Sequence, residues 1–420
     1  MPTPYRRNAR TPAGRISATP STANWGGLRG LLSQYPGAAA GYSLRSIGSG
    51  PVVKLRRASD NDEKDFTAAE LTGSVTGAEL VTNGGFDTDS DWAKGSGWSI
   101  TGGQAVCDGT QVSNSQLAQK QVGNDLIASG STHGVLTFTI SACSDFGSAG
   151  FRIATNSVFY KLDDLGITTT GTYTLMFVIG STASRFNFFT ESGVTMTLDD
   201  VSCKTYTATA AEEWTFVGAG GYGRQTIDAA YVRSWYDQSG SGNHAGQSTA
   251  NAQPKLITAG VTETESGKPA IMFDGSHSLN TSGGAELRTA SHCMFTVSQS
   301  SDGQFILTNS SSSTGPFGWI AQGNTSSPYS SYGTPTIHTN GVLSTPTNRL
   351  EVRDVYANGS QVLNTTLNAD TSSWSGFNIV DYSASFSYDG TMQELIIYPS
   401  DQSTNRVGIE TNINDHYGIY

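Results

Sequence analysis

One stretch of this chain, VRSWYDQSGSGNHAGQSTANAQPK at positions 232 to 255, gathers the side chains best suited to chemistry. Asp237, Asn243 and His244 supply a carboxylate, an amide and an imidazole, which could bind a sugar or an ion at the edge of a loop. The same residue types also close tight turns, because Asp and Asn side chains hydrogen-bond to nearby backbone and because Gly240 and Gly242 can adopt positive φ. Turn closure explains every residue type present and is the preferred interpretation, and sugar binding is kept as the functional alternative.

No catalytic constellation accompanies this stretch. The six histidines are not spaced as metal ligands, and the sequence lacks a P-loop, a GxSxG elbow, an HExxH motif and a dinucleotide-binding fingerprint. A retaining glycosidase needs two carboxyl groups about 5–5.5 Å apart, and an inverting one needs a wider pair. Because no second motif brings a nucleophile and an acid together, we predict that the chain is not an enzyme. A glycoside hydrolase or depolymerase is the less favoured alternative.

The elements that must position these residues are predicted to be strands. Charged residues are 14% of the chain and glycine occupies 49 positions, a composition typical of short strands joined by many turns. We therefore predict an all-β fold with two β-sandwich (jelly-roll) domains, an extended N-terminal arm and a short C-terminal helix. Residues 1–40 form the arm, residues 41–72 and 207–420 form a discontinuous sandwich, and residues 73–206 form a second sandwich inserted into it.

The C-terminal segment after Pro399 has a helical spacing. Its apolar and anchoring positions are predicted to be Val407, Glu410, Ile413 and Tyr417, with Asp401 or Ser403 as N-cap and Gly418 as the stop signal. The four cysteines, Cys107, Cys143, Cys203 and Cys293, have neither zinc-site spacing nor the density of a disulfide scaffold. They are predicted to be free, buried thiols.

The N-terminal arm is basic, whereas the rest of the chain is acidic. Nine Lys and Arg residues and no acidic residue precede Asp60, so the net charge of −11 leaves −20 for the remainder. Such an arm is predicted to anchor the protein on an acidic protein surface through Arg6, Arg7, Arg10 and Arg15, and nucleic acid is a less favoured partner. A solvated tail is an equally good interpretation. Neither a secretory signal nor a membrane-spanning segment is expected, so no membrane insertion is predicted.

Several motifs in the discontinuous domain carry a family resemblance. The set YSLR, VVKLRRASDN, DFTAAEL, WYDQSGSGNHA, QPK, GKPAIMFDG and IETNINDHYGIY resembles the concanavalin A-like, laminin-G-type domain of tail and virion proteins of tailed bacteriophages. It is similar, more distantly, to the catalytic sandwich of arabinofuranosidase B enzymes, without their other catalytic segments. The resemblance implies a virion structural protein, assembled in the host cytoplasm and located in the virion, in which the arm binds other virion proteins.

The inserted segment resembles a different family. Its opening, AELVTNGGFDTDSDWAKGSGWSI, and its ending, MTLDDVS, resemble carbohydrate-binding modules of the family 4/9 type. The resemblance implies glycan binding and a structural Ca²⁺ held by Asp87, Asp199 and Asp200, since hard oxygen ligands suit this ion. The alternative is that Asp87 caps a turn and that the other two carboxylates are solvated.

Aromatic side chains are the usual platforms for sugar rings. Trp92 and Tyr160 in the inserted segment and Trp319 in a Ser- and Gly-rich stretch are predicted to contact glycan, whereas Trp98 is predicted to lie in the core. The sequence thus predicts a phage surface protein that displays glycan-binding domains for attachment to the host, as a homo-oligomer or array. A purely architectural decoration or joining protein of the head or tail is the alternative.

Overall fold

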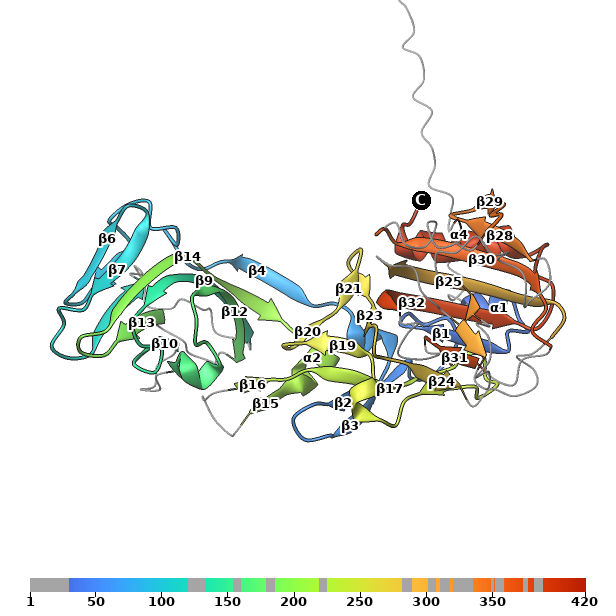
Figure 1. Ribbon diagram of the computed structural model, residues 1–420, viewed down its shortest axis with the longest axis horizontal. Coiled ribbons are helices and arrows are strands. Elements are labelled where there is room, and N and C mark those ends of the chain that lie inside the picture. Colours follow the sequence, from blue (N-terminus) through green and yellow to red (C-terminus); the bar gives the residue numbers. More distant parts are fainter. Residues whose placement is uncertain are drawn as a thin grey trace, which may run out of the picture.

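The structure is a computed structural model that describes residues 30–119, 133–153, 160–178, 186–218, 225–281, 289–300, 307–309, 318–319, 335–348, 351, 359–372, 377–380 and 388–420. It has two lobes joined by two antiparallel strands, β4 (Val75–Glu79) and β14 (Thr195–Thr207) (Figure 1). The predicted all-β sandwich fold is confirmed. Arg6, Arg7, Arg10 and Arg15, and most of the predicted arm, lie outside the described residues.

The larger lobe is built from residues on both sides of the inserted segment. Its strands hydrogen-bond into one closed sheet. They are β1 (Ala40–Ser43), β2 (Val53–Arg57), β3 (Glu63–Phe66), β17 (Ala230–Trp235), β18 (Ala245–Gly246), β19 (Lys255–Thr258), β20 (Val261–Thr262), β23 (Ile271–Asp274), β24 (Leu279–Thr281), β25 (His292–Ser300), β26 (Leu307–Asn309), β27 (Gly318–Trp319), β28 (Thr336–Thr339), β29 (Val342–Ser344), β30 (Val362–Ala369), β31 (Phe377–Ile379) and β32 (Asp389–Tyr398).

Short elements complete the larger lobe. Two hairpins pair β15 (Phe216–Gly218) with β16 (Gln225–Ile227) and β21 (Thr264–Glu265) with β22 (Lys268–Pro269). In the part of this lobe that the structure describes, the α-helices are α1 (Leu31–Gln34), α2 (Ala210–Thr215) and α4 (Arg406–Tyr417), and the 3-10 turns are η1 (Ala68–Leu71) and η3 (Ala250–Ala252).

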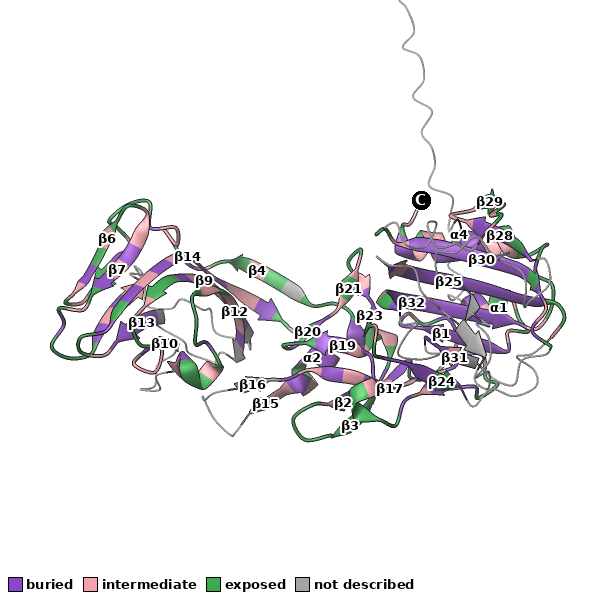
Figure 2. Ribbon diagram, in the orientation of Figure 1, coloured by how far each residue is buried: buried purple, intermediate pink, exposed green. Residues whose placement is uncertain are grey.

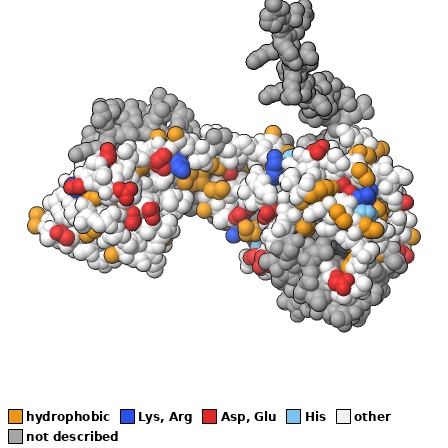
Figure 3. All heavy atoms as spheres, turned by 90° about the horizontal axis from the view of Figure 1, so that it is seen from above, with side chains coloured by type: hydrophobic (Ala, Val, Ile, Leu, Met, Phe, Trp, Pro, Cys, Tyr) orange, Lys and Arg blue, Asp and Glu red, His pale blue; other side chains and the backbone are white. Residues whose placement is uncertain are grey.

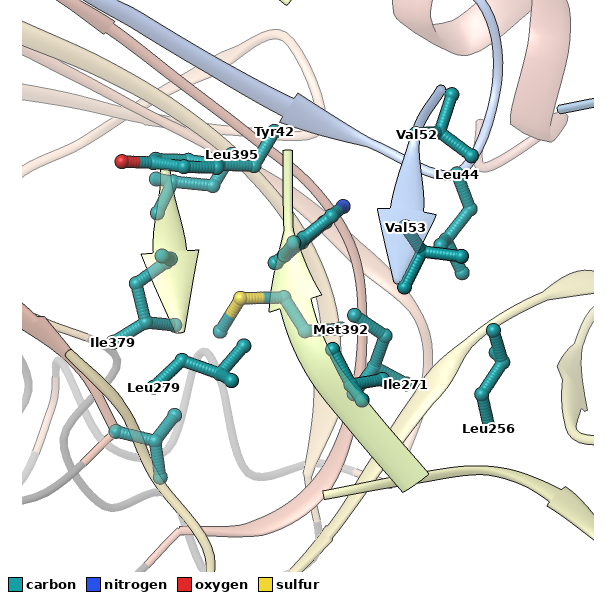
Figure 4. Packing of buried hydrophobic residues seen from close by; sticks show 14 of the residues in the cluster. Tyr42, Leu44, Val52, Val53, Leu256, Ile271, Leu279, Ile379, Met392 and Leu395 are labelled. Atoms are coloured by element: carbon teal, nitrogen blue, oxygen red, sulfur yellow. The ribbon is translucent and has the colours of Figure 1, made fainter. Parts of the chain in front are cut away.

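Strand β32 is buried on both of its faces, as the continuous band of buried residues in Figure 2 indicates. Leu395 and Ile397 belong to the main core of the larger lobe, together with Tyr42 and Trp235. Figure 4 shows Leu395 beside Tyr42 in this core. The alternate residues Ile396 and Tyr398 belong to a second core beneath α1 and α4. Successive side chains of a strand point to opposite faces, so β32 contributes to both cores. The larger lobe therefore has three layers, two of sheet and one of helix.

The C-terminal helix is confirmed as α4, with Gly418 in the left-handed conformation (φ 66°) at its C-cap. Two details of its prediction are wrong. Asn405 occupies the N-cap position without a side-chain cap hydrogen bond, and Val407 is 61% exposed. Ile409 faces the core in place of Val407, because it shares one helix face with Ile413 and Tyr417 at four-residue steps, whereas Val407 lies on the opposite side.

The smaller lobe consists of two sheets around a separate core that includes Phe138, Phe188 and Trp98. One sheet has the order β11 (Tyr160–Lys161), β10 (Ala149–Ile153), β13 (Phe186–Thr190), β8 (Ser115–Gln119), β5 (Trp92–Lys94). The other has the order β12 (Gly171–Val178), β9 (His133–Cys143), β14 (Thr195–Thr207), β7 (Gln104–Asp108), β6 (Trp98–Thr101), with β4 (Val75–Glu79) also paired to β14. The turn η2 (Asp163–Leu165) follows β11.

The two lobes are joined where β4 enters and β14 leaves the smaller one. These strands are antiparallel partners, with Thr76 opposite Tyr206, so both crossings occur at one place. There Glu212, which is fully buried, accepts hydrogen bonds from the Tyr206 hydroxyl at 2.8 Å and from the Thr209 N–H at 2.8 Å, and its other oxygen accepts from the Thr262 N–H at 2.9 Å. A single carboxylate thus ties the exit strand to the larger lobe.

The four cysteines are free, and three of them are buried, whereas Cys143 is half-buried. No helix of the described residues has the length and apolar character needed to cross a membrane.

Candidate functional site

The turn that follows β17 is organised by one carboxylate. Asp237 is 7% exposed, and its Oδ1 accepts from the backbone N–H groups of Gly41 and Ser239, both at 2.8 Å. Its Oδ2 accepts from the Ser239 hydroxyl at 2.9 Å and from the Asn243 N–H at 3.0 Å. Both oxygens therefore accept hydrogen bonds from groups of the protein itself.

The rest of the turn is fastened to β1 and the loop after it. Asn243 is 6% exposed, and its amide donates to the Ala39 carbonyl at 2.7 Å. Gln238 donates to the Ser43 carbonyl at 2.9 Å and accepts from the Ile47 N–H at 2.9 Å. Sugar binding by Asp237 and Asn243 stays a prediction that this geometry does not support, because the Asp237 carboxylate and the Asn243 amide N–H already pair with groups of the protein. His244 is exposed beside Tyr236, and its role in binding stays a prediction.

The predicted aromatic platforms have different environments. Trp92 is 2% exposed and packs against Phe86, with its indole N–H donating to the Asn83 carbonyl at 2.9 Å, so its burial does not support the prediction that it contacts glycan. Trp98 lies in the core, as predicted. Tyr160 is half-buried and stacks on Phe151 at 5.5 Å, which leaves its role a prediction. Trp319 is in β27, and its side chain lies outside the described residues.

The two end motifs of the inserted segment meet in space. The Val201 N–H donates to the Gly84 carbonyl at 2.9 Å, which places the NGGF turn against the LDDVS ending. The three predicted calcium ligands are not gathered there: Asp199 accepts from the Asp200 N–H at 2.8 Å and from the Gln104 amide at 3.4 Å, and Asp87 is exposed. The described residues hold no group of three or more His, Cys, Asp and Glu arranged for a metal ion. Calcium binding stays a prediction that this geometry does not support.

The outer face of the six-stranded sheet is rich in hydroxyl groups. Thr137 and Thr139 of β9 lie opposite Thr174 and Thr172 of β12, with hydroxyl oxygens 3.0 and 2.9 Å apart. The Gln104 amide donates to the Ser141 hydroxyl at 3.3 Å on the same face. We call the patch formed by these residues the hydroxyl face. Hydroxyl and amide groups of this kind can exchange hydrogen bonds with sugar hydroxyls.

A cleft of about 300 Å³ opens on the larger lobe. It lies where the loop after β1, η1, the β21–β22 hairpin and the end of α4 come together. Its polar lining consists of Arg45, Ser46, Thr72, Lys268, His416 and Tyr417, and its remaining lining residues are apolar. These lining residues include two cations, Arg45 and Lys268, and no acidic side chain, so we call it the positive cleft.

Arg45 is held at the cleft by a buried ion pair. Its Nε and Nη2 donate to the two carboxylate oxygens of Glu394 at 2.7 and 2.9 Å, and its Nη1 donates to Asn412 at 2.9 Å. The Glu394 side chain is fully buried and also accepts from the Ser43 hydroxyl at 2.7 Å. Because the pairing is bidentate, the guanidinium has one fixed orientation.

The pKa of His416 is lowered to about 4 by its burial and then by the positive charges of Arg45 and Lys268, which Glu394 partly offsets. Between pH 6.5 and 4 the unfolded chain therefore binds a proton at this residue that the folded chain does not, so stability falls as the pH falls through this range. We expect His416→Gln to reduce this loss by about 1–2 kcal/mol, after a discount for solvent screening. Urea denaturation at pH 7, 5.5 and 4 measures the free energy of unfolding of the wild type and of the variant. If this free energy falls equally with pH in both proteins, His416 is not the source of the loss.

Sequence reasoning missed the cleft completely. Arg45, Lys268 and His416 are far apart in the chain, and each is an ordinary surface residue type in its local context. No local signal could have joined them, because the closed sheet alone brings them together.

The chain was compared with known proteins. No family model and no curated protein matches it. Among solved structures it is similar to the tandem CBM51 modules of Sp3GH98, the family 98 glycoside hydrolase from Streptococcus pneumoniae SP3-BS71, at 9% identity and a TM-score of 0.17, over 78% of this chain and 99% of that chain. At such a TM-score the likeness carries no argument. The strands and sheets described above define the class of the protein, which is an all-β protein of the sandwich type.

Proposed function

We propose that this protein is a non-catalytic glycan-binding protein of a bacteriophage virion, in which the inserted sandwich is displayed for attachment to the host surface. The virion setting is supported by the sequence resemblance of the larger lobe. The observation that carries glycan binding is the hydroxyl face, a set of aligned hydroxyl and amide groups on one outer face of the inserted sandwich. Figure 1 shows that this lobe extends away from the larger one, which is consistent with its display.

A glycan array probed with the full-length protein tests the proposal. We expect binding to at least one class of host polysaccharide, and Thr139→Arg should remove it because the new side chain covers the hydroxyl face. Val112→Arg is the matched control, since Val112 is 91% exposed in the same lobe and outside this face. A flat array, or equal loss in both variants, would sink the proposal.

Deletion of residues 73–206 separates attachment from architecture. Because Thr76 and Tyr206 are opposite one another, the two cut ends lie close together and the larger lobe can be rejoined. Particles that assemble but no longer adsorb to the host support the proposal. Particles that fail to assemble support a purely architectural protein, and reducing sugar released from host glycan would reveal a depolymerase.

A further inference from the structure

The positive cleft on the larger lobe is separate from the hydroxyl face and has a different chemistry. Its volume of about 300 Å³ is at the small end of ligand sites, enough for a single sugar residue. Four elements distant in sequence meet around it, with cations on two of them, Arg45 after β1 and Lys268 in the hairpin, and the imidazole of His416 on α4. We propose that this cleft binds one carboxylate-bearing sugar residue, such as a uronate, of a host polysaccharide. This inference rests on the proposed function.

The cations of the cleft suit a carboxylate. Arg45 is already oriented by Glu394 and Asn412, so little conformational entropy is lost when it meets a ligand. The described residues offer Lys268 no ion pair, so its charge is available. Of the acidic groups near the cleft, Glu394 is fully buried and paired with Arg45, and Glu70 of η1 accepts from the Thr67 N–H at 2.8 Å. Glu265 of β21 lies opposite Lys268 in the hairpin but is not among the residues that line the cleft.

The rest of the lining suits a sugar ring. Leu44, Ala68, Ala69 and Pro269 supply small apolar surface, and Ser46 and Thr72 supply hydroxyl groups at the same cleft. A ring with C–H faces, hydroxyl groups and one carboxylate uses all three kinds of contact, whereas inorganic phosphate uses the cations alone.

The charge of the smaller lobe makes the cleft the better place for an acidic residue. Residues 73–206 contain twelve acidic and six basic residues, a net charge of 6 − 12 = −6. Acidic side chains are spread over the face of this lobe shown in Figure 3. The acidic residues of a host polysaccharide are therefore favoured at the cleft, whereas the hydroxyl face of the inserted sandwich suits its neutral residues.

The test is a titration of the full-length protein with glucuronate and galacturonate. Glucose and galactose probe the contribution of the sugar ring without the carboxylate, and inorganic phosphate probes the contribution of the negative charge without the ring. We expect uronates to bind, neutral sugars to bind at least about tenfold more weakly, and Lys268→Gln to weaken uronate binding by about tenfold through the lost charge-assisted contact. Lys268→Arg should restore most of it. Lys204→Gln removes the same charge from the smaller lobe and should change nothing.

NMR of His416 supplies a second readout. A carboxylate beside the imidazole favours its charged form, so uronate should raise the pKa of His416 above its value of about 4 in the free protein. Uronate binding that is unaffected by Lys268→Gln, or phosphate competing as well as uronate, overturns the inference. If the array shows binding that Thr139→Arg removes but no uronate binds, only the cleft inference is overturned. If the array is flat but uronate binds and Lys268→Gln weakens it, only the role of the hydroxyl face is overturned.

Discussion

Asp237→Ala is expected to destabilise the larger lobe by at least about 3 kcal/mol, because a buried donor left without its partner costs about 1–3 kcal/mol and three are left at once. These are the backbone N–H groups of Gly41, Ser239 and Asn243. Chemical denaturation followed by tryptophan fluorescence measures the loss, since Trp235 is fully buried directly before the turn.

Two controls define this prediction. Ser241→Ala in the same turn should have little effect, since this residue is exposed. The stability of the smaller lobe should not change, because its core is separate from that of the larger lobe. Asp237→Ala with wild-type stability but lost glycan binding would reverse our conclusion and restore the sugar-binding role.

Glu394→Gln is expected to cost about 3–5 kcal/mol, the range found when one partner of a buried ion pair is removed. The variant leaves Arg45, whose side chain is 13% exposed, with a charge that neither water nor a carboxylate can fully compensate. The Ser43 hydroxyl and the Tyr417 hydroxyl also lose a charged acceptor. Equilibrium denaturation at pH 7 measures the difference.

The solvated ion pair between Arg57 and Asp60 provides the comparison. Its carboxylate side chain is 45% exposed, so Asp60→Asn should leave the midpoint of unfolding almost unchanged. A loss for Glu394→Gln as small as the loss for Asp60→Asn would show that water reaches the Arg45 site freely. The cleft would then lack the fixed guanidinium on which the proposed carboxylate contact depends.

Local residue patterns were enough to predict part of this structure. Alternation of apolar and polar residues predicted β2, where Val53 and Leu55 are buried, and the positive φ of Gly240 and Gly242 is what a turn with Asp and Asn requires. The C-terminal helix and its Gly418 stop were also predictable, because capping depends on a few consecutive residues. These features share one property: their energetics are decided within about one turn or strand of the chain.

Tertiary structure alone decided which polar and aromatic groups are accessible. Trp92 was predicted to contact glycan, but it is buried because Phe86 and the Asn83 carbonyl enclose its ring and its N–H. Asp237 was a candidate ligand until its four donors, one of them on β1, were in place. Arg45, Lys268 and His416 form a cleft only after three distant segments meet. The sequence by itself determined the all-β character and the turns, since both depend on local propensity, whereas accessibility and charge proximity depend on which strands of a closed sheet become neighbours.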